Sequence, residues 1–158
     1  WTMVCDSVSL CLSKGLGAPV GSLVGGSREF VEAAVRVRKR LGGWMRQSGH
    51  LAAAALIALE ENVARLAEDH ALAKQLAEGF HALAGAACEP ARVETNIVLV
   101  EVRHPELGAA DVARRLGDYG VKVMPFGPRH LRFVTHLDVG PDDVERALRS
   151  AEAILGGA

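Results

Sequence analysis

The N-terminal third of the chain alternates short apolar stretches with glycine-rich turns. Residues 1–12 are apolar and short-sided, which favours a strand, and residues 22–26 can form a second strand that closes on a glycine turn. A helix is expected from about 28 to 41, because Ser27 can cap its start and two glycines stop it. Apolar residues recur along this helix with the helical period, so we expect one buried face: Phe30, Ala34, Val37 and Leu41.

A second, longer helical pattern begins near residue 48 and ends near residue 85. Its first part, 51–59, is apolar on all sides, and we expect it to be buried on all sides. From residue 60 the pattern becomes amphipathic, with Glu and Lys on one side and an apolar face on the other: Val63, Leu66, Ala73, Leu76, Phe80 and Leu83. Such a helix is typical of a segment that leaves one domain and packs on the next.

After Pro90 the pattern predicts a small α/β layer domain in the order β-α-β-β-α. The predicted elements are strands over 96–102, 121–126 and 131–137 and helices over 109–119 and 141–155. We therefore divide the chain into the end of one domain at 1–60, a linking helix at 61–90 and a small C-terminal domain at 91–158.

Composition narrows the classes of function. The chain has 158 residues and a net charge of −1, which argues against nucleic-acid or anionic-membrane partners. No apolar run reaches the ~18 residues of a membrane span. Its three cysteines form no CxxC, so neither a disulfide framework nor a metal site is expected. We predict a reducing compartment, cytosolic or organellar, and take the cytoplasm as the location. The chain starts at Trp1 rather than Met, so we expect that a preceding portion is missing.

Lys14 is the most informative candidate for chemistry. It follows an apolar strand and precedes the glycine-rich loop 15–21. An apolar setting penalises an ammonium and favours the free amine, a nucleophile that forms Schiff bases with carbonyl compounds. Flanking glycines would let the backbone approach a bulky cofactor. The alternative is an ordinary lysine whose ammonium reaches solvent from a turn, and both interpretations stay open.

Three common motifs are a poor fit to the same segment. The glycines at 15, 17 and 21 are one residue off the dinucleotide fingerprint, and no acidic residue follows on a second strand. A Ser-x-x-Lys nucleophile fails because Cys11 stands three residues before the lysine. No Gly-Lys pair ends a glycine loop, which excludes a P-loop.

The segment 13–22, Ser-Lys-Gly-Leu-Gly-Ala-Pro-Val-Gly-Ser, resembles the pyridoxal-phosphate lysine segment of the low-specificity L-threonine aldolases, which are fold type I (aspartate-aminotransferase-like) enzymes. Further motifs agree in order and spacing and extend the resemblance over essentially the whole chain: Arg38-Lys39, Gly42-Gly43, 45–49, 51–54, Thr95-Asn96 and 132–139.

The resemblance implies an α/β fold: the C-terminal part of a fold type I large domain followed by a small α/β C-terminal domain. It implies pyridoxal 5′-phosphate as cofactor and the cleavage of L-threonine or L-allo-threonine to glycine and acetaldehyde. It also implies a homodimer or homotetramer with sites between subunits, an amino-acid substrate, and no nucleic-acid or membrane partner. The family's N-terminal portion, with most of its cofactor cradle, has no counterpart in this chain.

The resemblance also assigns roles to four residues. Lys14 matches the lysine that holds the cofactor covalently, and Arg46 the arginine that reaches the cofactor phosphate of a neighbouring subunit. Lys39 matches a basic residue near that interface, although a solvated helix face explains it equally well. Arg132 matches the arginine that binds the substrate α-carboxylate; the alternative is an outward residue of an alternating strand. The chain departs from the family at Trp44, where a third glycine is usual.

Two rival functions remain at this stage. One is another fold type I activity, such as that of a racemase or an aminotransferase. The other is an inactive, truncated protein that acts only through association with subunits.

Overall fold

A computed structural model describes residues 3–157; Trp1, Thr2 and Ala158, the first two of which belong to the first predicted strand, lie outside the described residues. The chain forms two compact units, residues 1–65 and 66–158, and the boundary between them falls inside a single long helix. The first unit contains a two-stranded ribbon with a helix, and the second contains a four-stranded sheet with helices.

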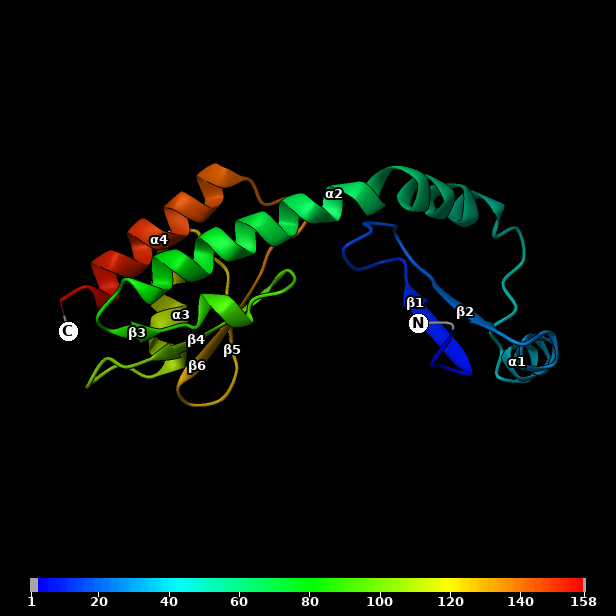
Figure 1. Cartoon of the computed structure of the whole chain (residues 1–158), viewed down its shortest axis with the longest axis horizontal. Coiled ribbons are helices and arrows are strands. Elements are labelled where there is room, and N and C mark those ends of the chain that lie inside the picture. Colours follow the sequence, from blue (N-terminus) through cyan, green and yellow to red (C-terminus); the bar gives the residue numbers. More distant parts are fainter. Residues whose placement is uncertain (1–2, 158) are drawn as a thin grey trace. The chain divides into compact units, whose positions relative to one another are not determined.

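The first unit confirms the predicted order of strand, strand and helix, although the first strand is shorter than the predicted 1–12. Strand β1 (Ser7–Cys11) pairs antiparallel with β2 (Ser22–Gly26), and helix α1 (Arg28–Arg40) follows directly (Figure 1). The Ser27 hydroxyl accepts a hydrogen bond from the Phe30 amide at 3.1 Å, which satisfies one of the free donors at the helix start. The predicted cap is therefore confirmed.

The predicted buried face of α1 is wrong. None of its residues is buried within the described chain: the Phe30 side chain is 40% exposed, and Leu41, just beyond the helix end, is 82% exposed. The physical reason is the shortage of a packing partner, since the described residues of this unit form a single two-stranded sheet, β1–β2. Phe30 packs against Gly26, where an added Cβ would come within 2.7 Å of the Phe30 ring.

Helix α2 (Gly49–His81) begins in the first unit, and there the prediction of complete burial over 51–59 is also wrong. Ala55 and Ala58 are buried, but Leu56 and Ile57 are more than half exposed. Ala55, Ala58 and Asn62 share one helix face, and the Asn62 amide donates to the Leu16 carbonyl at 2.8 Å. The described residues of this unit thus cover one side of the helix, the side that meets the glycine loop.

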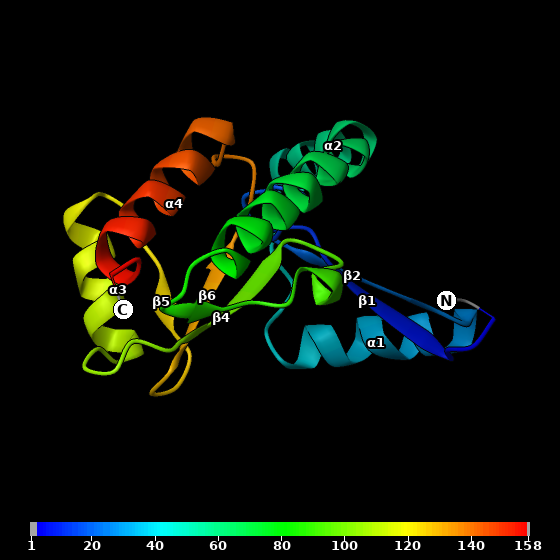
Figure 2. The same cartoon turned by 60° about the vertical axis from the view of Figure 1, so that its left-hand side comes forward.

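The second unit confirms the β-α-β-β-α order and adds a short strand. Its sheet has the order β3-β4-β6-β5 with every neighbouring pair antiparallel (Figure 2). The elements are β3 (Ala86–Ala87), the 3-10 turn η1 (Pro90–Arg92), β4 (Ile97–Val102), α3 (Ala109–Asp118), β5 (Met124–Pro125), β6 (His130–Val134) and α4 (Pro141–Leu155).

Strand β5 is much shorter than the predicted 121–126. Helix α3 ends in a left-handed Gly120 (φ 78°), and the Val121 amide donates to the Leu116 carbonyl at 3.0 Å. This helix-capping arrangement uses the amide that a longer strand would need. Pro125 has no amide hydrogen, which also limits pairing at this edge of the sheet.

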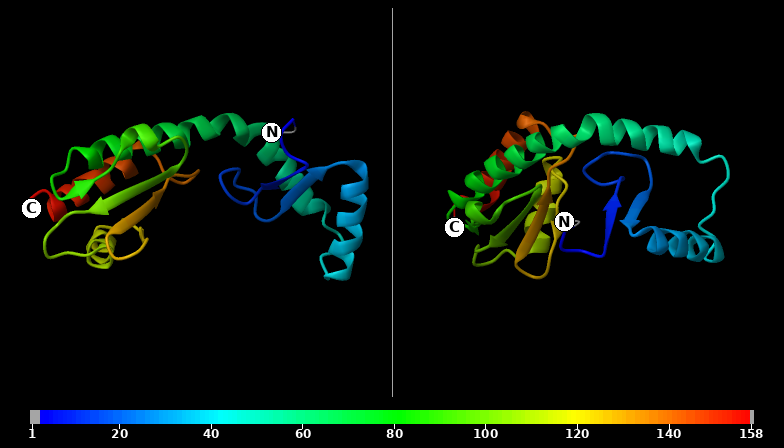
Figure 3. Two further views of the ribbon diagram at one scale, coloured as in Figure 1. Left: turned by 60° about the horizontal axis from the view of Figure 1, so that its bottom comes forward. Right: turned by 45° about the vertical axis from the view of Figure 1, so that its right-hand side comes forward.

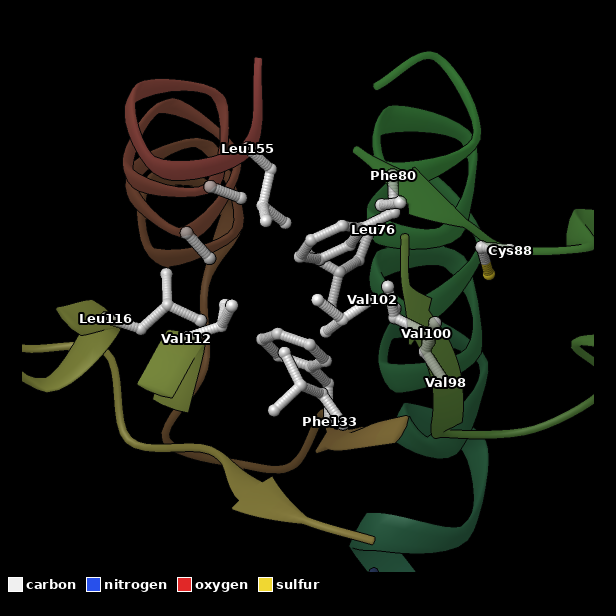
Figure 4. Close-up of a cluster of buried hydrophobic side chains, with 14 of the residues drawn as sticks. Leu76, Phe80, Cys88, Val98, Val100, Val102, Val112, Leu116, Phe133 and Leu155 are labelled. Atoms are coloured by element: carbon white, nitrogen blue, oxygen red, sulfur yellow. The ribbon is translucent and has the colours of Figure 1, made fainter. Parts of the chain in front are cut away.

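All three helices of the second unit contribute to one hydrophobic core on one face of the sheet. Figure 4 shows Phe80 of α2 beside Phe133 of β6, and their ring centroids lie 4.9 Å apart. Helices α2 and α4 run side by side (Figure 3), and a Cβ added at Gly79 would overlap Leu148. The core takes alternate strand residues, Val98, Val100, Val102, Leu131 and Phe133, and residues from each helix.

The opposite face of this sheet is open. Ile97 and Leu99 of β4 are 45% and 48% exposed, whereas the alternating valines of the same strand are fully buried. At the end of β6, the buried Thr135 hydroxyl donates to the Asp69 carbonyl of α2 at 2.7 Å and ties the strand to the helix. The sheet with the open face is therefore fixed by the helices that pack on its other face.

Candidate active site

The loop that carries Lys14 is held by backbone hydrogen bonds. The Leu12 amide donates to the Gly21 carbonyl, the Ala18 amide to the Leu12 carbonyl, and the Gly17 amide to the Lys14 carbonyl, at 2.9–3.0 Å. Gly17 and Gly21 have positive φ values of 72° and 119°, a conformation that glycine adopts without strain. The loop is therefore a fixed turn rather than a loose connection.

Lys14 itself is exposed in the described chain. Leu12, Leu16 and Ala18 are buried around it, but they anchor the loop and do not enclose the lysine. The apolar enclosure that we expected for Lys14 is therefore not found among the described residues. Its amino group makes no hydrogen bond or ion pair with residues 3–157, so the side chain is accessible on a fixed turn.

Cys11 lies next to this turn, at the end of β1. Its sulfur is 3.5 Å from the Ser13 hydroxyl. Hydrogen bonding to Ser13 lowers the pKa of the Cys11 thiol, and the positive charge of Lys14 adds to the effect. By contrast, burial raises the pKa of the Cys88 thiol in the other unit. Sequence reasoning did not identify this difference between the two cysteines.

The chain reverses direction at the C-terminal end of α1, where the basic residues Arg38, Lys39 and Arg40 lie. The Gly42 amide donates to the Lys39 carbonyl and the Gly43 amide to the Arg38 carbonyl, with Gly42 at φ 81°. This is the Schellman arrangement that ends many helices. A Cβ added at Gly43 would come within 2.9 Å of the Arg38 side chain, so glycine permits the chain to pass close to the helix end.

Trp44 follows this turn and contacts two of the cations. The Arg38 guanidinium carbon lies 4.8 Å from the centre of the Trp44 ring, and the Lys39 ammonium nitrogen lies 5.4 Å from it. Both distances are within the range of a cation–π contact. The predicted site residue Lys39 is therefore neither buried nor simply solvated, and sequence reasoning missed the ring that it contacts.

Arg46 is exposed and immediately precedes a residue with unusual backbone geometry. Gln47 has a φ of 51°, which places a non-glycine residue in the left-handed region. Such a conformation costs roughly 1–3 kcal/mol and persists where neighbouring structure imposes it. The His50 Nδ1 lies 2.9 Å from the Gln47 carbonyl oxygen, which supports the bend between Arg46 and α2.

Arg132 occupies the middle of β6, on the open face of the sheet. Its cross-strand partners are Leu99 of β4 and Met124 of β5. The residue is half-buried, and its Nε atom is shielded from solvent without a hydrogen-bond partner among the described residues. An N–H group of a guanidinium is costly to leave unpaired away from water. The position therefore suits an anionic ligand.

The four predicted site residues belong to different units. Lys14, Lys39 and Arg46 lie in the first unit and Arg132 in the second. Within residues 3–157, no hydrogen bond or ion pair joins any two of them. The same residues contain no group of three or more His, Cys, Asp or Glu side chains that could hold a metal ion. None of the described helices is long and apolar enough to span a bilayer.

Residues 1–104 match the profile of the beta-eliminating lyases. The chain belongs to the beta-eliminating lyase family. The match covers the lysine loop, the Trp44 turn, the whole of α2 and strand β4. Membership therefore rests on the segment that carries three of the four predicted site residues.

Individual relatives of this lyase-family chain are named as threonine aldolases. It is 48% identical over 151 residues to the Arabidopsis thaliana protein named probable low-specificity L-threonine aldolase 2. It is 42% identical over 154 residues to the low specificity L-threonine aldolase of Escherichia coli O157:H7. These alignments cover 95% and 98% of this chain but only 42% and 44% of the relatives. The chain thus spans less than half of their length, and the sequence resemblance is confirmed over that part.

A solved structure supports the fold. A candidate L-allo-threonine aldolase from Listeria monocytogenes EGD-E matches with a TM-score of 0.72 and 22% identity, over 95% of this chain and 45% of that one. At this identity the match concerns the fold alone. It confirms the predicted fold class of this lyase-family chain: the C-terminal part of a fold type I large domain followed by a small α/β domain.

Proposed function

We propose that the protein to which this chain belongs is a pyridoxal-phosphate-dependent aldolase that cleaves L-threonine and L-allo-threonine to glycine and acetaldehyde. The observation that carries the proposal is Arg132, whose shielded Nε lacks a partner among the described residues. The names of the relatives, which are threonine aldolases at 42–48% identity, give the substrate class.

Arg132 binds the substrate α-carboxylate. A guanidinium presents its N–H groups in a planar fork that matches the two oxygens of a carboxylate. The neighbours Leu99 and Met124 are apolar, so they hold the fork on the sheet face without competing for its hydrogen bonds. Because β6 is paired on both sides, the arginine fixes the position of the amino acid relative to a rigid sheet.

Lys14 attaches the cofactor through its primary amine. A primary amine condenses with an aldehyde with loss of water, and the exposed position on a fixed turn makes this amine accessible. When bound, pyridoxal phosphate supplies the electron sink that stabilises the charge left on Cα after bond cleavage. Gly15 and Gly17 allow the backbone beside Lys14 to approach a planar ring.

Lys39 and Arg46 bind the cofactor phosphate. A phosphate dianion needs cationic partners, and neither of these side chains has an ion pair within residues 3–157. We propose that Arg46 serves the site of a neighbouring subunit in a homodimer or homotetramer. The exposed apolar residues of α1 and of the start of α2 support such an interface, because apolar surfaces of this kind are commonly covered in assemblies.

The cleavage itself is balanced within the substrate. The β-hydroxyl group loses its proton, the Cα–Cβ bond breaks, and its electron pair stays with Cα. Cα then takes up one proton, so that threonine divides into glycine and acetaldehyde with no other reactant consumed. The residues of this chain contribute by holding the carboxylate and the cofactor while the bond breaks. The cytoplasmic location predicted from the cysteine content stays a prediction.

The test is an assay of the full-length protein that contains this chain, purified and supplied with pyridoxal phosphate and L-threonine. We expect glycine and acetaldehyde in equal amounts, and loss of both products in Lys14→Ala. Release of a 2-oxo acid, or loss of optical rotation without acetaldehyde, would assign another fold type I activity and overturn the proposal. Failure of the full-length protein to take up any cofactor would favour the alternative, a protein that acts only through subunit association.

A further inference from the structure

The stretch between Glu32 and Glu60 has an unbalanced charge. Five basic residues and no acidic residue lie in it: Arg36, Arg38, Lys39, Arg40 and Arg46. None of the five forms an ion pair with a described residue, whereas several exposed arginines of the second unit do, as with Arg114 and Asp111 at 2.9 Å. Charge is therefore concentrated at the end of α1 and in the turn that follows, within a chain whose net charge is −1.

One aromatic ring organises this cluster. Trp44 has Arg38 at 4.8 Å and Lys39 at 5.4 Å from its ring centre, while no such contact is recorded for the neighbouring Arg40. The arrangement depends on the Schellman turn, because Gly42 reverses the chain and Gly43 passes against Arg38. The Schellman turn thereby brings the Trp44 ring back against the last turn of α1.

We propose that Trp44 is a positioning residue that holds Arg38 and Lys39 together as a binding site for a phosphate dianion. The proposal rests on the proposed function, because we take the dianion to be the phosphate of the cofactor. It adds Arg38 and Trp44 to the residues that act on that phosphate. It also gives a role to the ring that stands where a glycine is usual in the resembling family.

The contact with Trp44 favours anion binding because it orders two long side chains before the anion binds. Free Arg and Lys side chains each lose rotamer freedom when they grip a ligand, which weakens binding. A cation resting on an indole ring has already lost part of that freedom, and the contact partly offsets the repulsion between two neighbouring charges. A dianion then meets two cationic donors that are already ordered by the same ring.

The stacking is tested without any cofactor. The chain has two tryptophans, so a Trp1→Phe background leaves Trp44 as the sole indole emitter. In that background we expect Arg38→Met and Lys39→Met each to change the emission intensity of Trp44. Arg40→Met removes one exposed charge from the same helix turn and serves as the matched control, which should leave the emission unchanged. Equal spectra for all three variants would overturn the proposal.

The binding role is tested with inorganic phosphate, followed by titration calorimetry of the 158-residue chain at constant ionic strength. We expect Trp44→Gly to raise the Kd for phosphate about threefold to tenfold, the size that cation–π contacts support. Trp44→Tyr, which keeps a ring, should stay within about twofold of the unsubstituted chain. Unchanged binding in Trp44→Gly, or no phosphate binding by the unsubstituted chain, would contradict the proposal.

The outcomes separate this inference from the proposed function. If Trp44→Gly weakens phosphate binding while the full-length protein forms no acetaldehyde from threonine, the positioning role stands and the aldolase assignment falls. If acetaldehyde forms at the full rate and phosphate binding is indifferent to Trp44, the aldolase stands and the positioning role falls.

Discussion

Arg132 and Leu99 are direct partners across strands β6 and β4, and both lie on the sheet face opposite the hydrophobic core. The charged Arg132 thus has the apolar Leu99 as its neighbour on this face of the sheet. Its shielded Nε has no hydrogen-bond partner in the described chain, which is why we propose that the substrate carboxylate binds here.

Replacing Arg132 by lysine should separate substrate binding from cofactor binding. Lysine keeps the charge but cannot make the bidentate contact. We expect the KM for L-threonine to rise about tenfold or more, as for the loss of a charge-assisted hydrogen bond, while the Kd for pyridoxal phosphate changes less than about twofold. Arg149→Lys, at an exposed ion pair with Glu145, is the matched control. Equal losses of both affinities would remove the carboxylate role from Arg132.

The thiols of Cys11 and Cys88 should differ in how the rate of their alkylation depends on pH. The pKa of Cys11 is lowered by its hydrogen bond to Ser13, whereas burial raises the pKa of Cys88. Because the thiolate is the reactive form, alkylation of Cys11 by iodoacetamide should reach half of its maximal rate at a lower pH than that of Cys88. Ser13→Ala should move the Cys11 profile to higher pH. Identical profiles in the two proteins would contradict this account of the loop.

The core of the second unit should depend on its aromatic pair. Phe80 is fully buried against Phe133 at a centroid distance of 4.9 Å. Phe80→Ala should lower the free energy of unfolding by about 3–5 kcal/mol, since it leaves a cavity in a packed core. Tyr119→Ala, at a half-exposed aromatic of the same unit, should cost about 1 kcal/mol or less. Urea denaturation measures both, and similar midpoints for the two variants would show that the core is assigned to the wrong residues.

Asp111 should make stability depend on pH in the acid range. The Gly108 amide and the Arg114 guanidinium hold the pKa of this carboxyl below its ordinary value. A depressed pKa in the folded state contributes stability that is present above about pH 4 and lost as pH falls through the folded value. Asp111→Asn should therefore be less stable than the unsubstituted chain at pH 7, with a gap that closes in strong acid. A gap of constant size between pH 7 and pH 2 would refute the assignment.

The sequence predicted those elements that local signals define. Helix α4 begins at Pro141 and ends at Leu155 as expected, and Ser27 caps α1 as expected, because proline and serine act on their own backbone neighbourhood. The length of β5 could not be predicted, since it depends on how the Val121 amide is shared between a strand and the cap of α3.

The main error of the sequence analysis was the prediction of buried helix faces in the first unit, and this error has a physical origin. Periodicity shows which residues need a partner surface, but it does not show whether the same chain supplies that surface. Leu56 and Ile57 are apolar by sequence and exposed in the structure. The contact of Trp44 with Lys39 was missed for a related reason, because a double-glycine turn sets the direction of the ring and no periodic pattern reports it.

The central claim is that Lys14 holds pyridoxal phosphate, and borohydride reduction followed by peptide mass mapping tests it most directly. The account predicts that the 158-residue chain, incubated with the cofactor and reduced, carries the reduced cofactor on the peptide that contains Lys14, and that Lys14→Ala carries none. Label spread over the other lysines, Lys39, Lys74 and Lys122, with no preference for Lys14, would contradict it.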